Sequence, residues 1–444
     1  MSSSEDVLTL SGLDHERIPF LQQSISSDYT DEESGKFTRK RQMSWAGDPV
    51  QEDRAHGPVL DLAMNLAACA FGASMLSLPF VLDISGALVG MFMIVGLGLV
   101  AVLASSSIMH AGFRFRKSSY TKIVAEAFGK RASVFAEALL SACLFVAAVS
   151  YVVGLADLLP DMIGFTSRMS RTMRIFFIYA GLWPITWVGS LSAFGPSSIF
   201  ACIGCYVQAV ALVTGAIFSD VDVPGPELLF KFSPAGIALS MPMVTFTHAY
   251  HYVLTDTFLE LKNPSKVRLM STVWTTGVTL TTCYLIVAII GFLLYGGQNV
   301  PSNVLTGLGN GSPVIGIATW SIGLLLFATY SLFIIPLRRR LEEMLFGRQT
   351  RKLNRNRILA ASVIGALVII ASILLRDLYL ANTVAGGCIA IVTFVIPGLL
   401  DVYCWKEFKD DRNLVTIARG VLLLCAGTMA AFIGLFGSLL PLKA

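Results

Sequence analysis

Long apolar stretches alternate with short polar segments along most of the chain. A stretch of about 20 apolar residues is long enough to cross a bilayer as a helix. Eleven stretches have about this length. They predict transmembrane helices at approximately 60–82, 87–112, 134–157, 173–191, 197–218, 235–257, 272–295, 313–336, 358–375, 380–403 and 417–440. An odd number of spans places the two ends of the chain on opposite sides of the membrane.

The first 57 residues differ from the rest of the chain. They are rich in Ser, Asp, Glu, Lys and Arg, and they lack both the apolar region of a signal peptide and the hydrophobic side chains of a core. We therefore predict a disordered cytosolic tail over residues 1–57 and a transmembrane domain over residues 58–444. Serines in "SSSED" and "RKRQMS" lie beside charged clusters, which suits recognition by kinases. The alternative is a chance match in a Ser-rich segment.

The positive charges of the short loops lie mostly on one side of the predicted membrane. Cytosolic loops carry an excess of Lys and Arg. With a cytosolic N-terminus, the inside would hold Arg114, Arg116, Lys117, Lys122, Lys130, Arg131, Lys262, Lys266, Arg268 and the basic run from Arg338 to Arg357. Arg168, Arg171 and Arg174 are the exceptions, because they fall on the outer side. The pattern predicts a cytosolic N-terminus and a C-terminus on the opposite side.

One outer loop carries a sequence motif for glycosylation. The loop "GGQNVPSNVLTGLGNGS" has no charged residue and contains Asn310-Gly-Ser312, which fits the acceptor pattern. Pro313 follows directly and disfavours modification. Asn310 is therefore a glycosylation candidate, and an unmodified asparagine is the alternative.

The composition agrees with a polytopic membrane protein and excludes several other classes. Hydrophobic residues make up 55% of the 444 and charged residues 14%, against roughly 25% charged in a soluble domain. The net charge of +4 is small, so it gives no reason to expect a nucleic-acid partner. All eight cysteines lie in or beside apolar stretches, including the Cys202 and Cys205 pair, which we interpret as buried helical residues.

No pattern typical of an enzyme occurs in the polar segments. They contain no Ser, His and Asp combination, no phosphate-binding loop and no spaced metal ligands. We therefore expect neither an enzyme nor a bound cofactor or metal.

The first span contains the stretch "CAFGASMLSLPF" at Cys69–Phe80, which is poorly suited to a continuous helix. Gly72 lies near the middle of the span, and Pro79 removes a helix hydrogen-bond donor one to two turns later. A break at this depth is tolerated only where the freed backbone groups face protein or a water-filled cavity. The alternative is that Gly, Ala and Ser allow another helix to pack closely.

The sixth span favours the first of these alternatives. It has Pro242 near its middle, followed by the segment "MVTFTHAYH", which carries two histidines. Ionisable groups inside a span point to a functional site. Interrupted helices at corresponding positions of two halves indicate the binding site of a secondary transporter, and these two spans are five apart. The spacing predicts an inverted repeat of five plus five helices, with one extra helix at the end.

Three segments resemble the amino acid/auxin permease family of transporters. "GASMLSLPF" in the first span resembles the family's G-T-G-I-L-x-L-P-Y signature, and "HYVLTDTFLELKNPSKVR" resembles its sixth span and following loop. "FATYSLFIIPLRRRLEEMLFG" resembles its eighth span. The three segments occur in the family's order and on the matching spans. The resemblance implies an all-α integral membrane protein with a LeuT-like fold, in which helices 1 and 6 are discontinuous.

The resemblance also implies that the chain moves amino acids or related small solutes by alternating access. An unwound first span would present backbone N–H groups to the substrate carboxylate, because a helix N-terminus favours an anion. We assign this role to Gly72, Ala73, Ser74 and Met75. The substrate ammonium would meet carbonyl groups freed around Thr245, Phe246 and Thr247. Cys69 and His248 would shape the pocket for the substrate side chain.

The sequence departs from the sodium-coupled members of this family. They place an Asn four residues before the first signature glycine, paired with a Thr of the eighth span, and this chain has Ala68 there. Asn65 and Thr329 remain as a candidate shifted sodium site. We therefore favour proton-coupled or uncoupled transport over sodium coupling. His251 matches the family's histidine and is the candidate proton carrier; the alternative is a neutral histidine that joins two helices.

A nutrient sensor is the alternative function. It would bind the same amino acid and signal through its N-terminal tail with little flux. The sequence also leaves open whether the protein resides in the plasma membrane or in a vacuolar or lysosomal membrane.

Overall fold

The computed structural model describes residues 58–187, 197–218, 224–258, 261, 265–306, 308, 313–346, 355–375 and 377–437. The predicted tail over residues 1–57 and the glycosylation candidate Asn310 lie outside these residues. The elements of the described part are helices, in the order α2 (Val59–Ala70), η1 (Ala73–Ser77), α3 (Leu78–Ser85), α4 (Ala87–Phe115), α5 (Tyr120–Met162), η2 (Gly164–Arg168), α6 (Arg171–Thr186), α7 (Ser197–Ile217), α8 (Pro226–Leu229), α9 (Pro234–Thr247), α10 (His251–Phe258), α11 (Lys266–Leu294), α12 (Pro313–Phe346), α13 (Arg355–Leu374), α14 (Leu378–Ala390), η4 (Ile391–Val395), α15 (Ile396–Glu407), η5 (Lys409–Asp411) and α16 (Leu414–Phe436).

Each of the eleven predicted spans contains a helix or a pair of helices. Among the described residues, seven helices are long and apolar enough to cross a membrane by themselves, and one bent pair, 59–70 with 73–85, qualifies as an eighth span. The predicted fourth, fifth and sixth spans correspond to α6, α7 and the α9–α10 pair. Helices α6, α9 and α10 have 16, 14 and 8 residues, and α7 counts among the shorter apolar helices by its stretch Ala201–Ile217. The all-helical membrane fold is confirmed, whereas the number of eleven spans stays a prediction.

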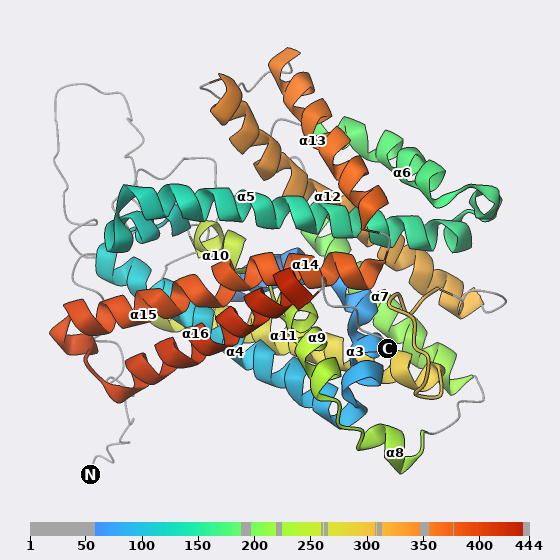
Figure 1. Cartoon of the computed structure of the whole chain (residues 1–444), viewed down its shortest axis with the longest axis horizontal. Helices are drawn as coiled ribbons and strands as arrows, with labels where there is room; N and C mark the ends of the chain where they lie inside the picture. Colours follow the sequence, from blue (N-terminus) through green and yellow to red (C-terminus); the bar gives the residue numbers. More distant parts are fainter. Residues whose placement is uncertain are drawn as a thin grey trace, which may run out of the picture.

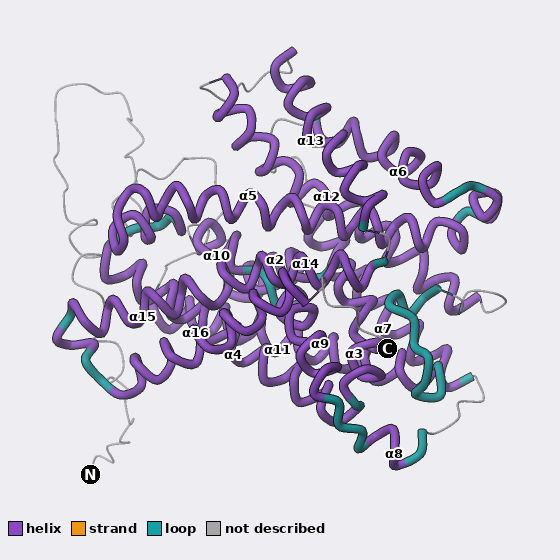
Figure 2. Tube along the Cα trace, in the orientation of Figure 1, coloured by secondary structure: helices purple, strands orange, loops and turns teal. Residues whose placement is uncertain are grey.

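Helix α5 runs across the molecule in Figure 1. It contacts α6, α12, α13 and α14, and α12 crosses it and packs against α7 as well. Helix α14 also packs against α9 and α16, and α11 packs against α2, α3, α4 and α7. The Cα trace in Figure 2 shows α2 near the centre of this arrangement. The two interrupted spans therefore lie inside the bundle and are covered by other helices.

Local sequence explains where the sixth span begins. Ser233 caps α9, since its hydroxyl accepts a hydrogen bond from the Gly236 N–H at 3.1 Å. Pro234 occupies the first turn, where its missing N–H costs nothing. Pro242 lies in the interior of α9 and prevents one helical hydrogen bond there. Helix α9 therefore has a well-capped N-terminus, and its second half, which ends at Thr247, lacks one helical hydrogen bond.

The tenth span is continuous but contains one wide turn. A π-helical turn, η4, joins α14 to α15 just before Pro397, which has no N–H to donate. The Tyr120 hydroxyl donates to the Val392 carbonyl at 2.7 Å and so satisfies an oxygen in this turn. A tyrosine of one helix thus donates a hydrogen bond to a backbone carbonyl at an irregular turn of another helix. The same type of hydrogen bond occurs at the first span.

Candidate functional site

The first span is broken at the stretch singled out in the sequence. Helix α2 ends at Ala70, and both Phe71 and Gly72 have extended backbones, with Gly72 at φ −172° and ψ −159°. The chain then resumes as a continuous helical segment over 73–85, bent by 61° from the first half. A Cβ added to Gly72 would overlap the Tyr151 hydroxyl, so only glycine fits beside this side chain. The predicted discontinuity of helix 1 is therefore confirmed.

Three consecutive carbonyl groups at this break are satisfied by three tyrosines. The hydroxyls donate to the carbonyl oxygens of Cys69, Ala70 and Phe71, and the donors are Tyr252 at 3.0 Å, Tyr284 at 3.0 Å and Tyr151 at 3.1 Å, respectively. The tyrosines come from α10, α11 and α5. A buried carbonyl without a partner costs free energy, and here each partner comes from a different helix. We call Tyr151, Tyr252 and Tyr284 the tyrosine collar.

The sixth span is interrupted between α9 and α10, as predicted, and this break satisfies most of its own polar groups. The N–H groups of His248 and Ala249 donate to the Thr245 and Phe246 carbonyls at 3.3 and 3.2 Å. The Thr247 hydroxyl donates to the Val244 carbonyl at 2.7 Å. These bonds form a tight local turn, so little of the interrupted backbone needs help from other helices.

Tyr284 joins the two breaks directly. Its hydroxyl lies 3.0 Å from the Ala70 carbonyl oxygen and 2.7 Å from the Thr247 carbonyl oxygen. A phenol has one proton, so it can donate fully to only one of these oxygens at a time. Tyr284 is fully buried, and its ring packs edge to face against Phe71 and His248. The two interrupted spans therefore meet at one side chain.

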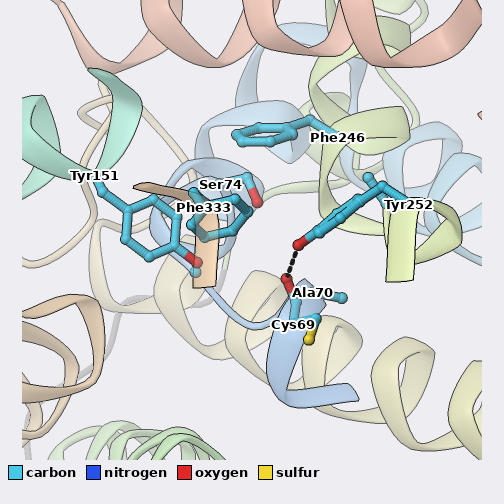
Figure 3. A pocket seen from close by; sticks show the side chains of 9 residues that line it. Cys69, Ala70, Ser74, Tyr151, Phe246, Tyr252 and Phe333 are labelled. Atoms are coloured by element: carbon cyan, nitrogen blue, oxygen red, sulfur yellow. Dashed lines mark hydrogen bonds between the residues drawn. The ribbon is translucent and has the colours of Figure 1, made fainter. Parts of the chain in front are cut away.

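A narrow cavity lies beside the breaks. It is lined by Cys69, Ala70, Gly72, Ser74, Tyr151, Phe246, Ala249, Tyr252 and Phe333. Figure 3 shows the rings of Phe246, Phe333, Tyr151 and Tyr252 around Ser74, with the Tyr252 hydroxyl directed at the Cys69 carbonyl. The lining contains backbone from both interrupted spans, four aromatic rings and no ionisable acid or base of the Asp, Glu, His, Lys or Arg types.

The structure brings part of the predicted substrate site together in this cavity. Cys69, Gly72, Ser74 and Phe246 line it. The other predicted residues are buried beside it and do not line it: Ala73, Met75, Thr245, Thr247 and His248. Thr245 donates to the Met241 carbonyl of its own helix, and the Met75 sulfur accepts a bond from the Cys205 thiol at 3.5 Å.

The candidate coupling residues lie at three separate places. His251 Nε2 lies 2.9 Å from the Ala101 carbonyl oxygen and 3.1 Å from the Ser105 hydroxyl, both on α4. Asn65 is partly buried on α2. Thr329 is buried on α12, where its hydroxyl donates to the Leu325 carbonyl one turn earlier. Their roles in coupling stay predictions.

Sequence reasoning missed the tyrosine collar. Tyr151 and Tyr284 lie outside the three segments that resemble the family, Tyr252 lies inside one of them without standing out there, and the partner of each is a backbone carbonyl far away in the chain. The available signal was weak: each is a tyrosine within an apolar span, and a buried tyrosine hydroxyl needs a partner. Phe333 and Ala249 were also missed: both lie in segments singled out in the sequence, but an apolar side chain there looks the same as a packing residue.

One group of side chains at a helix end has the composition of a metal site. His110, Cys404 and Asp411 place their ligand atoms within 4.8 Å of one another. However, Arg114 donates to both oxygens of Asp411 at 2.9 and 2.8 Å. Burial would raise the pKa of the Asp411 carboxyl, but hydrogen bonds from Arg114 and His110 lower this pKa below its usual value. The arrangement is therefore an ion-pair network that joins α4 to the loop before α16.

Solved structures with a similar fold are transporters. A manganese transporter of Eremococcus coleocola, crystallised with an aromatic bis-isothiourea compound, aligns with a TM-score of 0.59 over 88% of this chain and 91% of that chain, at 11% identity. A histidine-to-alanine mutant of the same transporter aligns with a TM-score of 0.58 over 85% and 86% of the two chains, at 12% identity. At this identity the match concerns the fold, and it confirms the LeuT-like architecture.

Characterised relatives include amino acid transporters of plants, fungi and animals. Amino acid transporter AVT1H of Arabidopsis thaliana is 25% identical over 83% of this chain and 88% of its own length. Vacuolar amino acid transporter 5 of Schizosaccharomyces pombe is 26% identical over 62% and 67%. Sodium-coupled neutral amino acid transporter 7 of Xenopus laevis is 21% identical over 81% and 84%. The family model described as transmembrane amino acid transporter protein matches residues 56–440, and the chain therefore belongs to this amino acid transporter family.

Proposed function

We propose that this member of the family is a secondary active transporter that carries neutral amino acids by alternating access and couples their movement to protons. The observation that carries the proposal is the cavity at which the two interrupted spans meet. Its lining takes Cys69 and Gly72 from the first span and Phe246 and Tyr252 from the sixth. Discontinuous helices that meet in this way form the substrate sites of secondary transporters.

The chemistry of the cavity favours a neutral substrate side chain. Its lining offers four aromatic rings and the Cys69 side chain, with no Asp, Glu, His, Lys or Arg among the described residues. An acidic or basic substrate side chain would lie there without an opposite charge, and burying an unpaired charge costs several kcal/mol. A small aliphatic or aromatic side chain would instead pack against the rings.

The backbone at the breaks can recognise the charged groups that all amino acids share. The segment 73–85 begins at the break with its positive end, where the first N–H groups of a helix lack a preceding turn to donate to, which suits a carboxylate. The Met75 N–H already donates to the Gly72 carbonyl at 3.1 Å, so the N–H groups of Ala73 and Ser74 are the candidates for this role. The Ser74 hydroxyl lies at the cavity and can assist. The Thr247 carbonyl is held by Tyr284, so a substrate ammonium would compete with this hydroxyl for the oxygen.

Proton coupling is favoured over sodium coupling by the way the first break is satisfied. In transporters with broken helices, unwound backbone carbonyls coordinate the coupling ion. Here the carbonyls of Cys69, Ala70 and Phe71 each accept a bond from a tyrosine of the collar. Ala68 precedes them, so the first span also lacks the asparagine side chain used by sodium-coupled members. The break is therefore satisfied without a cation.

We also propose a vacuolar or lysosomal membrane, with the N-terminus in the cytosol and the C-terminus on the other side. The choice of membrane rests on the fungal relative, whose name places it in the vacuole. The orientation of the two termini rests on the distribution of Lys and Arg in the loops.

Uptake of radiolabelled amino acids by proteoliposomes tests the proposal. The purified full chain is supplied with a panel of neutral, acidic and basic amino acids, with pH and sodium gradients imposed separately. Accumulation of neutral amino acids that follows the pH gradient supports it. Accumulation that needs sodium contradicts the coupling, and preference for a charged amino acid contradicts the substrate class. Binding without any flux would instead favour the sensor.

A further inference from the structure

Two buried histidines flank the break of the sixth span, and the structure distinguishes between them. His248 directly follows the end of α9, whereas His251 is the first residue of α10. Their side chains are 1% and 0% exposed. From the sequence, His248 was assigned to the substrate pocket, and His251, which the family resemblance singles out, was the candidate proton carrier.

We infer that the coupling proton binds to Nε2 of His248 and that His251 stays neutral. This inference rests on the proposed proton coupling and names the atom that would serve it. During the cycle Nε2 would take up a proton from the water on one side of the membrane and release it to the water on the other side.

The hydrogen bonds of His248 leave one acceptor free. Nδ1 lies 3.1 Å from both the Val244 carbonyl oxygen and the Thr247 hydroxyl oxygen. The carbonyl can only accept, and the Thr247 hydroxyl donates its own proton to the same carbonyl at 2.7 Å, so Nδ1 carries the hydrogen of the neutral ring. Nε2 is then the nitrogen with the lone pair, and it is buried without a hydrogen-bond partner in the described part of the chain. A buried polar atom without a partner calls for an explanation. A site that is filled by a proton in another step of the cycle supplies one.

The space next to Nε2 is small and polar. A Cβ added to Gly98 of α4 would lie 2.9 Å from Nε2 and 2.5 Å from the Thr281 hydroxyl of α11. The Tyr284 ring lies on the other side of the imidazole, with ring centres 5.2 Å apart. None of these contacting groups is a carboxylate or a fixed cation, and among the described residues the other titratable base that interacts with His248 is His251. A proton at Nε2 would therefore be the main change in charge here.

The helix ends explain why His248 is the better proton site. The C-terminal end of a helix carries a partial negative charge and favours a protonated histidine, whereas the N-terminal end opposes one. His248 caps the C-terminal end of α9, and His251 begins α10. His251 is also anchored, because its Nε2–H points to the Ala101 carbonyl and its ring stacks on Tyr250 at 4.7 Å. Its Nδ1 is likewise buried without a hydrogen-bond partner in the described part of the chain, so the helix ends and this anchoring, rather than a free nitrogen, separate the two histidines.

A proton on His248 would act where the two breaks are joined. The His248 ring packs against Tyr284, and the Tyr284 hydroxyl holds both the Ala70 and the Thr247 carbonyls. A cation near an aromatic ring interacts with its electrons. Protonation of His248 would therefore change the interactions of Tyr284, the side chain that connects the two interrupted spans.

The test compares His248→Asn with His251→Asn in proteoliposomes of the full chain. Asparagine keeps a donor at the position of Nδ1 and removes Nε2. Two rates are measured for each variant: amino acid exchange at equal pH on both sides, and uptake driven by a gradient of two pH units. We expect the ratio of driven uptake to exchange to fall at least tenfold in His248→Asn and to stay near the wild-type ratio in His251→Asn.

Other outcomes separate the two levels of the proposal. If the wild type shows exchange but no response to the pH gradient, the proposed proton coupling is wrong, and the assignment of Nε2 is wrong with it. If the wild type responds and His248→Asn responds equally, only the assignment is wrong. Should His248→Asn show no exchange because it misfolds, Gly98→Ala leaves the histidine in place and puts a methyl group against Nε2. Its ratio must then fall, and an unchanged ratio overturns the inference.

Discussion

The two interrupted spans satisfy the backbone groups freed at their breaks in different ways. At the first break, three consecutive carbonyls depend on hydroxyls from three other helices. At the sixth break, the N–H groups and hydroxyls bond mainly to carbonyls three or four residues earlier in the same span. The first break is therefore maintained by tertiary structure and the sixth mostly by local structure. Substitutions that remove hydrogen bonds should thus have larger effects around the first break than around the sixth.

The largest effect is expected at Gly72. In Gly72→Ala the new methyl group overlaps the Tyr151 hydroxyl, so either the tyrosine or the break must move. A displacement of about 1 Å at a reacting or binding site can cost about 100-fold in rate, and we expect uptake to fall by about this factor. Uptake in proteoliposomes measures it. Gly96→Ala on α4 is the matched control, because a Cβ there meets nothing within 4 Å. Equal uptake by both variants would show that the close contact does not matter.

The next largest effect is expected for Tyr284→Phe. This change removes the one hydroxyl that serves both breaks and leaves the Ala70 and Thr247 carbonyls without it. An unsatisfied buried acceptor costs about 1–3 kcal/mol, so the free energy of unfolding should fall by about that amount and uptake by about tenfold. Thermal unfolding and uptake check the two effects. Wild-type stability in this variant would mean that the breaks do not depend on one another through Tyr284.

A smaller effect is expected for Tyr252→Phe. Its hydroxyl satisfies the Cys69 carbonyl only, while its ring lines the cavity and remains in the variant. One lost hydrogen bond contributes about 1 kcal/mol, so we expect the KM for a neutral amino acid to rise about threefold to fivefold, with kcat less affected. The kinetics of uptake over a range of substrate concentrations separate the two parameters. A loss as large as that in Tyr284→Phe would contradict the special position of Tyr284.

The smallest effect is expected at the sixth break. Thr245→Val keeps the shape of the side chain and removes a hydroxyl that donates only to the Met241 carbonyl of its own helix. Such local bonds contribute little to helix stability, so uptake should stay within about twofold of the wild type. If Thr245→Val abolishes uptake in protein that is correctly folded, the sixth break is not locally maintained, and the Thr245 hydroxyl has a role in transport beyond its bond to Met241.

Much of the architecture follows from short-range features of the sequence. The lengths of the apolar stretches predict the membrane helices, and Gly72 with Pro79, and Pro242 with the polar segment after it, mark the two interruptions. These features act through backbone geometry and hydrophobic length, which depend on neighbouring residues in the chain. The same reasoning placed Cys69, Gly72, Ser74 and Phe246 at the cavity, because each lies next to a break.

Only the tertiary structure decided which side chains complete the site and how each histidine is held. Tyr151, Tyr252 and Tyr284 reach carbonyls 80, 183 and 214 residues away in the chain. Such pairings depend on helix rotation and depth, which hydrophobic length does not specify. His248 and His251 likewise differ in their partners on α4 and α11 rather than in local sequence. By itself the sequence determined where the backbone would open, and the packing of the helices determined which groups would satisfy it.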